Sequence, residues 1–298
     1  MRVLVTGADG FIGGHVLERL LASGHEVLAV ALGETEVSSG FKSVKWFFGD
    51  ISNTSEIKKH VISYDPEAMI HLAWEGIPDY GYDMSRRNID ISLGISNLVI
   101  DNSCCRKIIS TGSCWEYGNR KGVCMESDAI AADSYFSWAK SSVNGYLGIK
   151  CKEHKIDFKW LRLFYVYGPG QKEKSIIPSI IRAFTEGRHP EIRNPANRND
   201  YIYVKDVADA IFLALEKNTD NIIYNVGSGR SVPAYEVAGT IASEMKCVYE
   251  PGTGSGNGQH EDFWADTTRI HSDLGWKPEY SLEKGILETI RYFKKRCY

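Results

Sequence analysis

The sequence predicts an α/β protein in which a doubly wound parallel sheet is followed by a smaller α/β lobe. Three observations support this prediction. Short apolar segments alternate with amphipathic helical segments through the first half of the chain. The first apolar segment runs directly into a cluster of glycines. After Pro169 the regular alternation stops, and the helical segments are separated by shorter strands and by loops.

The strands and helices of the expected sheet follow one another in chain order. Each expected strand is a short apolar run, and these runs lie at 2–6, 26–31, 44–48, 68–72, 106–110 and 158–164. Each expected helix has apolar residues three and four positions apart, at about 12–23, 54–63, 86–103 and 134–154. Because strands joined by helical crossovers run parallel, we expect helices on both faces of the sheet.

The rest of the chain predicts a second, smaller domain. Helical spacing of apolar residues occurs at about 175–187, 205–217, 233–245 and 280–294, with short strands at 201–204 and 222–226. The predicted domains are 1–165, to which the chain returns at about 201–230, and 166–298. The glycine-rich segment 251–258 is expected to form a loop.

Composition limits the classes of partner. A chain of 298 residues with 43% hydrophobic content can bury a large core. A net charge of −3 without a basic run argues against a nucleic-acid or membrane-surface binder and favours a small-molecule partner. Seven cysteines without a C-x-x-C spacing indicate neither a metal site nor a disulfide framework. Since no leader-like or long apolar segment is present, we expect a cytoplasmic protein.

The first expected turn carries glycines at the spacing that a dinucleotide requires. Gly7 permits a sharp turn after the strand, Gly10 leaves room for a pyrophosphate, and Gly13 allows close packing of helix and strand. The N-terminus of the following helix then faces the negative charge of the phosphates. We therefore expect this Rossmann-type turn to bind a nucleotide cofactor through Gly7, Asp9, Gly10, Phe11, Ile12 and Gly13.

The glycine spacing G-x-x-G-x-x-G and several later motifs resemble the extended short-chain dehydrogenase/reductases, or NAD-dependent epimerase/dehydratase family, that act on nucleotide-diphosphate sugars. The motifs occur in that family's order and cover nearly the whole chain. They are G-D-I at 49–51, I-H-L-A at 70–73, R-R-N-I at 86–89, S-C-W-E-Y-G at 113–118, the segment 161–169, the segment 198–207, A-D-T at 265–267 and L-G-W-K-P at 274–278.

The resemblance implies further cofactor contacts. Asp50 would accept a hydrogen bond from the adenine amine, beside Ile51. The other implied contacts are Ala31, Leu72, Ala73, Asn88, Ser110, Lys140, Phe164 and Val166. Members that prefer NAD usually carry an acid at the position of Ala31. Its absence leaves room for a 2′-phosphate, but no arginine follows at 32–35, so the cofactor is NADP or NAD with the balance slightly towards NADP.

The resemblance also assigns catalytic positions, and one of them departs from the family. Ser113 matches the serine or threonine that binds the reacting oxygen, and Lys140 matches the lysine of Y-x-x-x-K. The tyrosine of that motif is replaced by Phe136. Tyr135 is no direct substitute, because it is rotated by about 100° on the helix. Two hypotheses stay open: an engineered or natural inactive site, or natural activity in which Ser113, Cys114 or a water carries the proton.

The residues after Ser113 bear on the reaction. The family's 4,6-dehydratases carry an Asp-Glu pair there, whereas this chain has Cys114 and Trp115, so dehydration is not expected. The segment S-C-W-E-Y-G at 113–118 resembles the corresponding segment of the 4-ketoreductases of deoxysugar nucleotides, such as the CDP-abequose synthase group. A 4-ketoreductase is therefore favoured, with a 4-epimerase as the alternative. An inactive NAD(P)-sensing protein is a third hypothesis, of a different class.

The implied substrate is a nucleotide-diphosphate sugar. Its implied contacts are Trp74, Ser113, Cys114, Trp115, Tyr165, Arg198 and Asp266. Arg198 would pair with the diphosphate. The base and the sugar would be selected by loops around 75–85, 170–200 and 251–262. The helices at 86–103 and 134–154 resemble those of the family's dimeric four-helix bundle, so a homodimer is a hypothesis, although core packing also explains much of their apolar pattern.

Overall fold

The computed structural model describes residues 1–251 and 262–296, and their contacts divide the chain into two compact units. The first unit comprises Met1–Asn119, Ser127–Leu163 and Ala208–Tyr224, and the second comprises Arg120–Glu126, Phe164–Val207 and Asn225–Tyr298. The chain therefore crosses between the units five times. Residues 252–258 of the predicted glycine-rich loop lie outside the described part of the chain.

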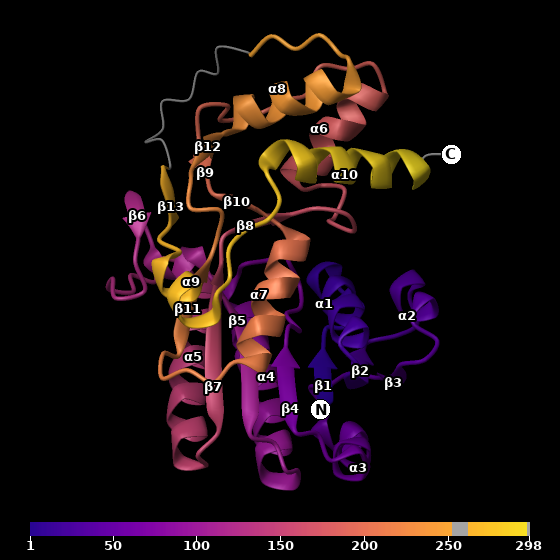
Figure 1. Cartoon of the computed structure of the whole chain (residues 1–298), viewed down its shortest axis with the longest axis vertical. Coiled ribbons are helices and arrows are strands. Elements are labelled where there is room, and N and C mark those ends of the chain that lie inside the picture. Colours follow the sequence, from indigo (N-terminus) through magenta and orange to yellow (C-terminus); the bar gives the residue numbers. More distant parts are fainter. Residues whose placement is uncertain (252–261, 297–298) are drawn as a thin grey trace. The chain divides into compact units, whose positions relative to one another are not determined.

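The main feature of the fold is a seven-stranded parallel sheet (Figure 1). Its order is β11-β7-β5-β4-β1-β2-β3. The strands are β1 (Arg2–Thr6), β2 (Glu26–Ala31), β3 (Lys45–Phe48), β4 (Ala68–His71), β5 (Lys107–Ser113), β7 (Asp157–Leu163) and β11 (Ile223–Val226). The order reverses between β1 and β4, which is the doubly wound arrangement. The predicted fold class is confirmed.

The apolar runs of the sequence form the centre of this sheet. In β1 the side chains of Val3, Leu4 and Val5 are all fully buried, which is the pattern of a strand covered on both faces. The strand pairs in parallel with β2 and β4, where Val3 lies opposite Val27 and Ala68. This register brings the carboxyl ends of three strands to one edge of the sheet.

The helices of the first unit separate and cover the strands (Figure 1). They are α1 (Phe11–Ala22), α2 (Glu36–Gly40), α3 (Thr54–Tyr64), α4 (Tyr82–Asn102), the 3₁₀ helix η1 (Cys114–Tyr117), α5 (Tyr135–Glu153) and most of α7 (Val204–Glu216). One hydrophobic cluster joins α3, α4 and α5 to the sheet through residues such as Ile57, Ile95 and Val143. Burial of these apolar faces stabilises the helices against the sheet.

The second unit contains short strand pairs and helices. The pairs are β8 (Tyr165–Tyr167) with β10 (Tyr201–Tyr203), β9 (Arg198–Asn199) with β12 (Val232–Pro233), and β6 (Gly122–Cys124) with β13 (Phe263–Ala265). The helices are α6 (Ile176–Thr185), α8 (Ala234–Met245), α9 (Thr268–Leu274) and α10 (Leu282–Arg296). Their core gathers α6, α8 and α10 around Tyr167 and Tyr203.

Two features of the strands differ from the sequence expectation. The strand expected at 106–110 continues as β5 to Ser113, although Ser110, Thr111 and Ser113 lack the apolar pattern of a buried strand. The two- and three-residue strands β6, β8, β9, β12 and β13 were not expected, because such short segments show no period. The extension of β5 matters most, because it places Ser113 at the edge where the strands end.

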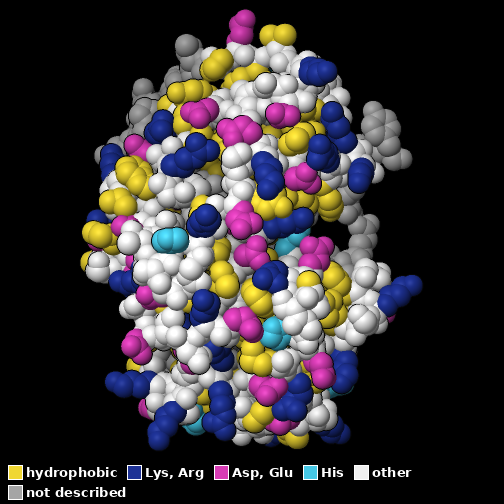
Figure 2. All heavy atoms as spheres, in the orientation of Figure 1, with side chains coloured by type: hydrophobic (Ala, Val, Ile, Leu, Met, Phe, Trp, Pro, Cys, Tyr) yellow, Lys and Arg dark blue, Asp and Glu magenta, His cyan; other side chains and the backbone are white. Residues whose placement is uncertain are grey.

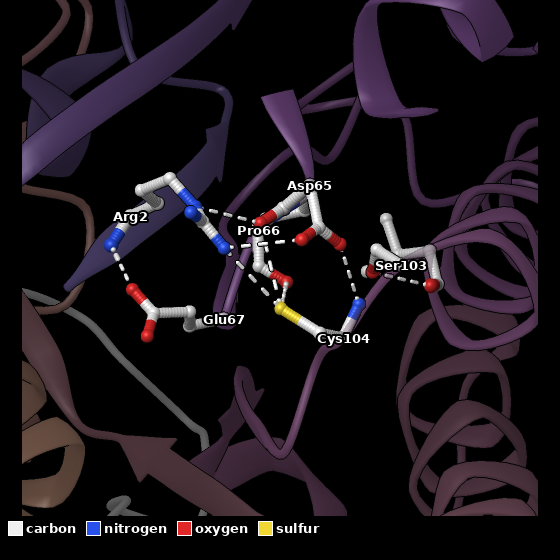
Figure 3. A network of polar contacts seen from close by, with 7 residues as sticks. Arg2, Asp65, Pro66, Glu67, Ser103 and Cys104 are labelled. Carbon is white, nitrogen blue, oxygen red and sulfur yellow. Dashed lines mark hydrogen bonds and ion pairs between the residues drawn. The ribbon is translucent and has the colours of Figure 1, made fainter. Parts of the chain in front are cut away.

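The opposite edge of the sheet is held by a polar network around Arg2 (Figure 3). The guanidinium of Arg2 donates to the backbone oxygen of Asp65 at 2.8 Å and to its carboxylate at 3.1 Å. The same carboxylate accepts the amide of Cys104 at 2.8 Å, and the amide of Arg2 donates to Glu67. The network therefore ties together the segments that enter β1, β4 and β5.

The surface carries both signs of charge. On the face shown in Figure 2, lysine and arginine side chains are interspersed with aspartate and glutamate side chains. Within residues 1–251 and 262–296, no helix has the length and apolar composition that a bilayer-spanning segment needs.

Candidate active site

The carboxyl ends of β1, β2 and β4 border a cavity of about 480 Å³ in the first unit. This edge, beside the reversal of strand order, is where open α/β sheets bind ligands. Nine predicted cofactor-binding residues line the cavity: Gly7, Asp9, Gly10, Ala31, Asp50, Ile51, Leu72, Ala73 and Asn88. Phe11, Ile12, Gly13, Ser110 and Lys140 belong to the same unit but are not lining residues.

The glycine turn has the shape that a phosphate group requires. Gly7 has a φ of +66°, and a Cβ there would lie 2.8 Å from the amide nitrogen of Ala73. A Cβ on Gly13 would collide with the carbonyl oxygen of Gly7. The N-cap of α1 is Gly10, which offers no side chain to bond the first amides of the helix. These amides and the open turn fit the pyrophosphate of a dinucleotide.

One end of the cavity carries an ion-pair network that sequence reasoning missed. Arg87 donates to Asp50 at 3.0 Å and to Glu75 at 2.7 Å, and all three side chains line the cavity. Hydrogen bonds from Ser52, reinforced by the Arg87 guanidinium, hold the pKa of Asp50 below its ordinary value. Asp50 is therefore an ionised acceptor. The only sequence signal for Arg87 was its position next to Asn88.

Asn88 positions the loop between β4 and α4. Its side-chain oxygen accepts the amide of Glu75 at 2.7 Å, and its side-chain nitrogen donates to the carbonyl oxygens of Glu75 and Met84. Both ends of the amide group are thus used inside the protein. The loop that carries Trp74 and Tyr80 is thereby attached to the first turns of α4.

Ser113 stands at the junction of β5 and η1, where a buried charge pair fixes the backbone. Its hydroxyl accepts the amide of Trp115, and its amide donates to Glu116 at 2.9 Å. Glu116 also accepts from Trp160 at 3.0 Å and from Arg162 at 3.1 Å. The S-x-x-E spacing from Ser113 to Glu116 is a capping box, a signal that could have identified Glu116 from the sequence.

Helix α5 supplies Phe136 and Lys140 on its buried face. The hydroxyl of Ser134 accepts a hydrogen bond from the amide of Ser137, and Ser134 thereby caps the N-terminus of the helix. Phe136 is 7% exposed. Tyr135 is 55% exposed, and its ring packs against that of Tyr82. Tyr135 therefore does not occupy the place of Phe136.

Lys140 is a buried cation with few polar partners. Its Nζ donates to the carbonyl oxygen of Thr111 at 2.8 Å and lies 3.7 Å from the centroid of the Trp74 ring. Burial lowers the pKa of Lys140 to about 7, partly opposed by the charge of Glu116. The ammonium group can therefore lose or gain a proton near neutral pH.

Four rings form an aromatic cluster beside Lys140: Trp74, Tyr80, Trp115 and Phe136. The Phe136 centroid lies 5.6 Å from that of Trp74, 5.2 Å from that of Tyr80 and 5.5 Å from that of Trp115. Tyr80 also contacts Trp115 at 5.1 Å. The structure thus brings together the predicted substrate residues Trp74 and Trp115 and adds Tyr80, for which the sequence offered no signal. The predicted Cys114 is buried in η1.

The second unit holds the remaining predicted residues. Arg198 donates to the carbonyl oxygen of Ser231 at 3.0 Å and lies 3.5 Å from the carboxylate of Asp262, with 40% of its side chain exposed. Asp266 accepts the amide of Thr268 at the start of α9. Tyr165 and Val166 lie in β8, directly after the buried Phe164. Across the described ranges, no three His, Cys, Asp or Glu side chains are grouped to hold a metal ion.

Comparison with known proteins identifies the family. The model of the NAD dependent epimerase/dehydratase family matches residues 3–227. The chain belongs to this family. The resemblance that the sequence motifs indicated is confirmed, and the epimerase/dehydratase family comprises nucleotide-sugar epimerases, dehydratases and reductases.

Relatives within the epimerase/dehydratase family match the chain over nearly its full length. A UDP-glucose 4-epimerase of Mycolicibacterium smegmatis is 27% identical and covers 99% of both chains. A dTDP-4-dehydro-6-deoxyglucose reductase of Escherichia coli is 25% identical over 97% of this chain and 96% of its own. A CDP-abequose synthase of Salmonella muenchen is 26% identical over 97% of each.

A solved structure of the family agrees with this fold. The UDP-glucose 4-epimerase of Thermotoga maritima, crystallised with UDP-glucose, has a TM-score of 0.89, 26% identity and full coverage of both chains. In the present chain, the residues that line the cavity at the ends of β1, β2 and β4 belong to the same unit as Ser113 and Lys140. The reaction must be inferred from the residues around them, because the relatives are epimerases, dehydratases and reductases.

Proposed function

We propose that this protein is an NAD(P)-dependent nucleotide-sugar 4-ketoreductase that acts in deoxysugar nucleotide biosynthesis in the cytoplasm. The observation that carries the proposal is the state of the carboxylate in η1. Glu116 is fully buried and bonded to Ser113, Trp160 and Arg162, while Cys114 and Trp115 are not acids. No carboxylate of η1 is therefore available for the proton transfers of a dehydratase, which leaves a 4-ketoreductase or a 4-epimerase. The resemblance of residues 113–118 to the 4-ketoreductases favours the reductase.

The proposed roles follow from the positions of the side chains. The bound cofactor would supply the hydride for C4 of the sugar. The Ser113 hydroxyl would bond the C4 oxygen and stabilise the charge that develops on it. Lys140 would hold the nicotinamide ribose, with its ammonium group directed by the Thr111 carbonyl. The aromatic cluster would pack against the sugar and suit one that has lost hydroxyl groups.

We propose NADP as the preferred cofactor, although binding of NAD is expected as well. Ala31 ends β2 without an acid that would oppose a 2′-phosphate. Arg87 is the guanidinium that lines the cavity, and its pairs with Asp50 and Glu75 reduce the charge it offers. The preference is therefore expected to be small.

We propose a nucleotide-diphosphate sugar as the substrate.

We also propose that the protein is a homodimer. Aromatic side chains on α4 and α5 support the dimer. Tyr82 is 49% exposed and packs on Tyr135, which is 55% exposed, and on Trp138, which is 40% exposed. Light scattering should give twice the chain mass for the parent protein. Trp138→Arg should shift it towards the monomer, whereas a monomeric parent would contradict the dimer.

The decisive experiment separates the three functions by the fate of the cofactor. The protein is incubated with NADPH deuterated at C4 and a panel of 4-keto-6-deoxy sugars on dTDP, CDP and GDP. A reductase consumes the cofactor in step with product and leaves deuterium on the sugar. In a parallel incubation with oxidised cofactor and UDP-glucose or UDP-galactose, an epimerase interconverts the two sugars without net reduction of the cofactor. A sensor binds NADPH but no nucleotide sugar.

Phe136→Tyr belongs in the same experiment, because it restores the family's proton donor. Loss of a general acid costs about 10²–10⁴-fold in rate. The variant should therefore turn over at least about 10²-fold faster than the parent, with little change in substrate binding. No turnover in either protein would reject the ketoreductase.

A further inference from the structure

We propose that Tyr80 donates the proton to the sugar oxygen in place of the phenol that Phe136 lacks. The inference deepens the proposed ketoreductase and rests on it. Tyr80 lies on the loop between β4 and α4, and its ring packs against the ring of Phe136 at 5.2 Å with an angle of 68°. The donor would thus stand next to the position where the family carries it.

Tyr80 is the member of the aromatic cluster with a phenol. Trp74 and Trp115 offer only indole N–H groups, and Phe136 offers no polar atom. The Tyr80 ring also contacts Trp115 at 5.1 Å, and Trp115 is bonded through its amide to the hydroxyl of Ser113. Tyr80 therefore packs against both Phe136 and the 3₁₀ helix that follows Ser113.

The alternative donors have other surroundings. Tyr135 is 55% exposed and packs on Tyr82, which is not a member of the cluster. Cys114 is 3% exposed within η1. The Ser113 hydroxyl caps η1, and a serine needs an adjacent base to exchange protons efficiently. Tyr80 is partly exposed, so its hydroxyl can be reprotonated from water.

The protonation state of Tyr80 suits a reduction. Burial raises the pKa of Tyr80, so the phenol carries its proton before the reaction starts. A reduced nicotinamide bound by this chain would supply the hydride for C4 and would itself be oxidised. The electron pair of the C=O bond would move to the oxygen, where the Tyr80 O–H proton would neutralise it, and the resulting phenolate would take a proton from water.

The loop is held well enough to position the ring. The Asn88 side chain bonds both the amide and the carbonyl group of Glu75, and Asp79 accepts the amide of Gly81 at 2.9 Å. Tyr80 is the residue that the Asp79–Gly81 bond spans. Within the described residues no hydrogen bond directs the Tyr80 hydroxyl, and the Lys140 ammonium group donates to the Thr111 carbonyl oxygen. Tyr80 should therefore be a weaker acid catalyst than a tyrosine at 136.

The experiment compares Tyr80→Phe with Tyr82→Phe in single-turnover loss of NADPH absorbance. Tyr82 lies two residues further on, but its ring packs outside the cluster, on Tyr135 and Trp138. We expect Tyr80→Phe to lower the rate by about 10²-fold with KM unchanged, and Tyr82→Phe to stay within about twofold of the parent. A rate of Tyr80→Phe equal to that of the parent would overturn the inference and leave the ketoreductase standing.

A second pair of variants excludes a merely structural role. In the Phe136→Tyr protein the family donor is present, so adding Tyr80→Phe should cost less than about threefold. An equal loss in both backgrounds would mean that Tyr80 only supports the fold, and would overturn the inference. Turnover in Phe136→Tyr beside a wholly inactive parent would also overturn it, since Tyr80 is present in that parent. Absence of turnover in both would reject the ketoreductase itself.

Discussion

Arg162 Nε lies 3.1 Å from Glu116 Oε2, and the two side chains are 1% and 0% exposed. Removing one partner of a buried pair leaves the other charge uncompensated, at a cost of about 3–5 kcal/mol. We therefore expect Glu116→Ala to lower the free energy of unfolding in urea by about 3–5 kcal/mol. Glu288→Ala breaks an exposed pair with Arg291 and should cost less than about 1 kcal/mol. Similar losses of unfolding free energy in the two variants would contradict a buried ion pair between Glu116 and Arg162.

The lowered pKa of Lys140 predicts that the free energy of unfolding depends on pH. Its pKa is about 7 in the folded protein and 10.5 in an unperturbed lysine. Between these values the unfolded chain holds a proton that the folded protein has lost, so stability rises with pH across this window. Below about pH 7 both states are protonated, and the cost of the buried charge is constant. Urea unfolding at pH 7, 8 and 9 should show the parent gaining stability relative to Lys140→Met, and a constant difference would refute the shift.

Cofactor choice depends on the end of β2. We expect NADP and NAD to bind within about tenfold, a difference below roughly 1.4 kcal/mol, with NADP ahead. Ala31→Asp should weaken NADP selectively, because a carboxylate would face the 2′-phosphate. Calorimetric titration measures both affinities, and a hundredfold preference of the parent for NAD would overturn the expectation.

Arg198 provides a test of the nucleotide-sugar contact. If its partly exposed guanidinium binds the diphosphate, Arg198→Ala should weaken nucleotide-sugar binding by about 1.5–3 kcal/mol and leave NADPH affinity unchanged. Arg291→Ala removes an exposed arginine of α10 in the same unit and is the control, with no effect expected on either ligand. Equal loss of both ligands in Arg198→Ala would indicate a folding defect instead.

Features with a local cause could be predicted from the sequence. The glycines after β1 and the four-residue spacing of Phe136 and Lys140 are set by neighbours in the chain, and the structure has the expected turn and helix face. Partners distant in sequence could not be predicted. Arg162 reaches Glu116 across 46 positions, and Arg87 reaches Asp50 across 37. Both pairs depend on the order of strands and on loop geometry, neither of which a periodic pattern encodes.

The position of β11 has a consequence for synthesis on the ribosome. Strand β11 covers the outer edge of β7, but it begins 60 residues after β7 ends. At a synthesis rate of about 5–20 residues per second, the edge of β7 stays unpaired for roughly 3–12 s before β11 is made. An unpaired strand edge invites association between nascent chains, and charges on the strand oppose it.

Strand β7 carries three charged residues, and two of them, Lys159 and Arg162, are each 1% exposed in the finished fold. We expect these two charges to oppose association between nascent chains during this interval and to form ion pairs afterwards. On chains stalled at residue 200, Lys159→Leu should raise aggregation, whereas the substitution of an exposed lysine such as Lys152 should not. A charge that the folded protein buries would then act twice, first on the unpaired strand edge and later in an ion pair.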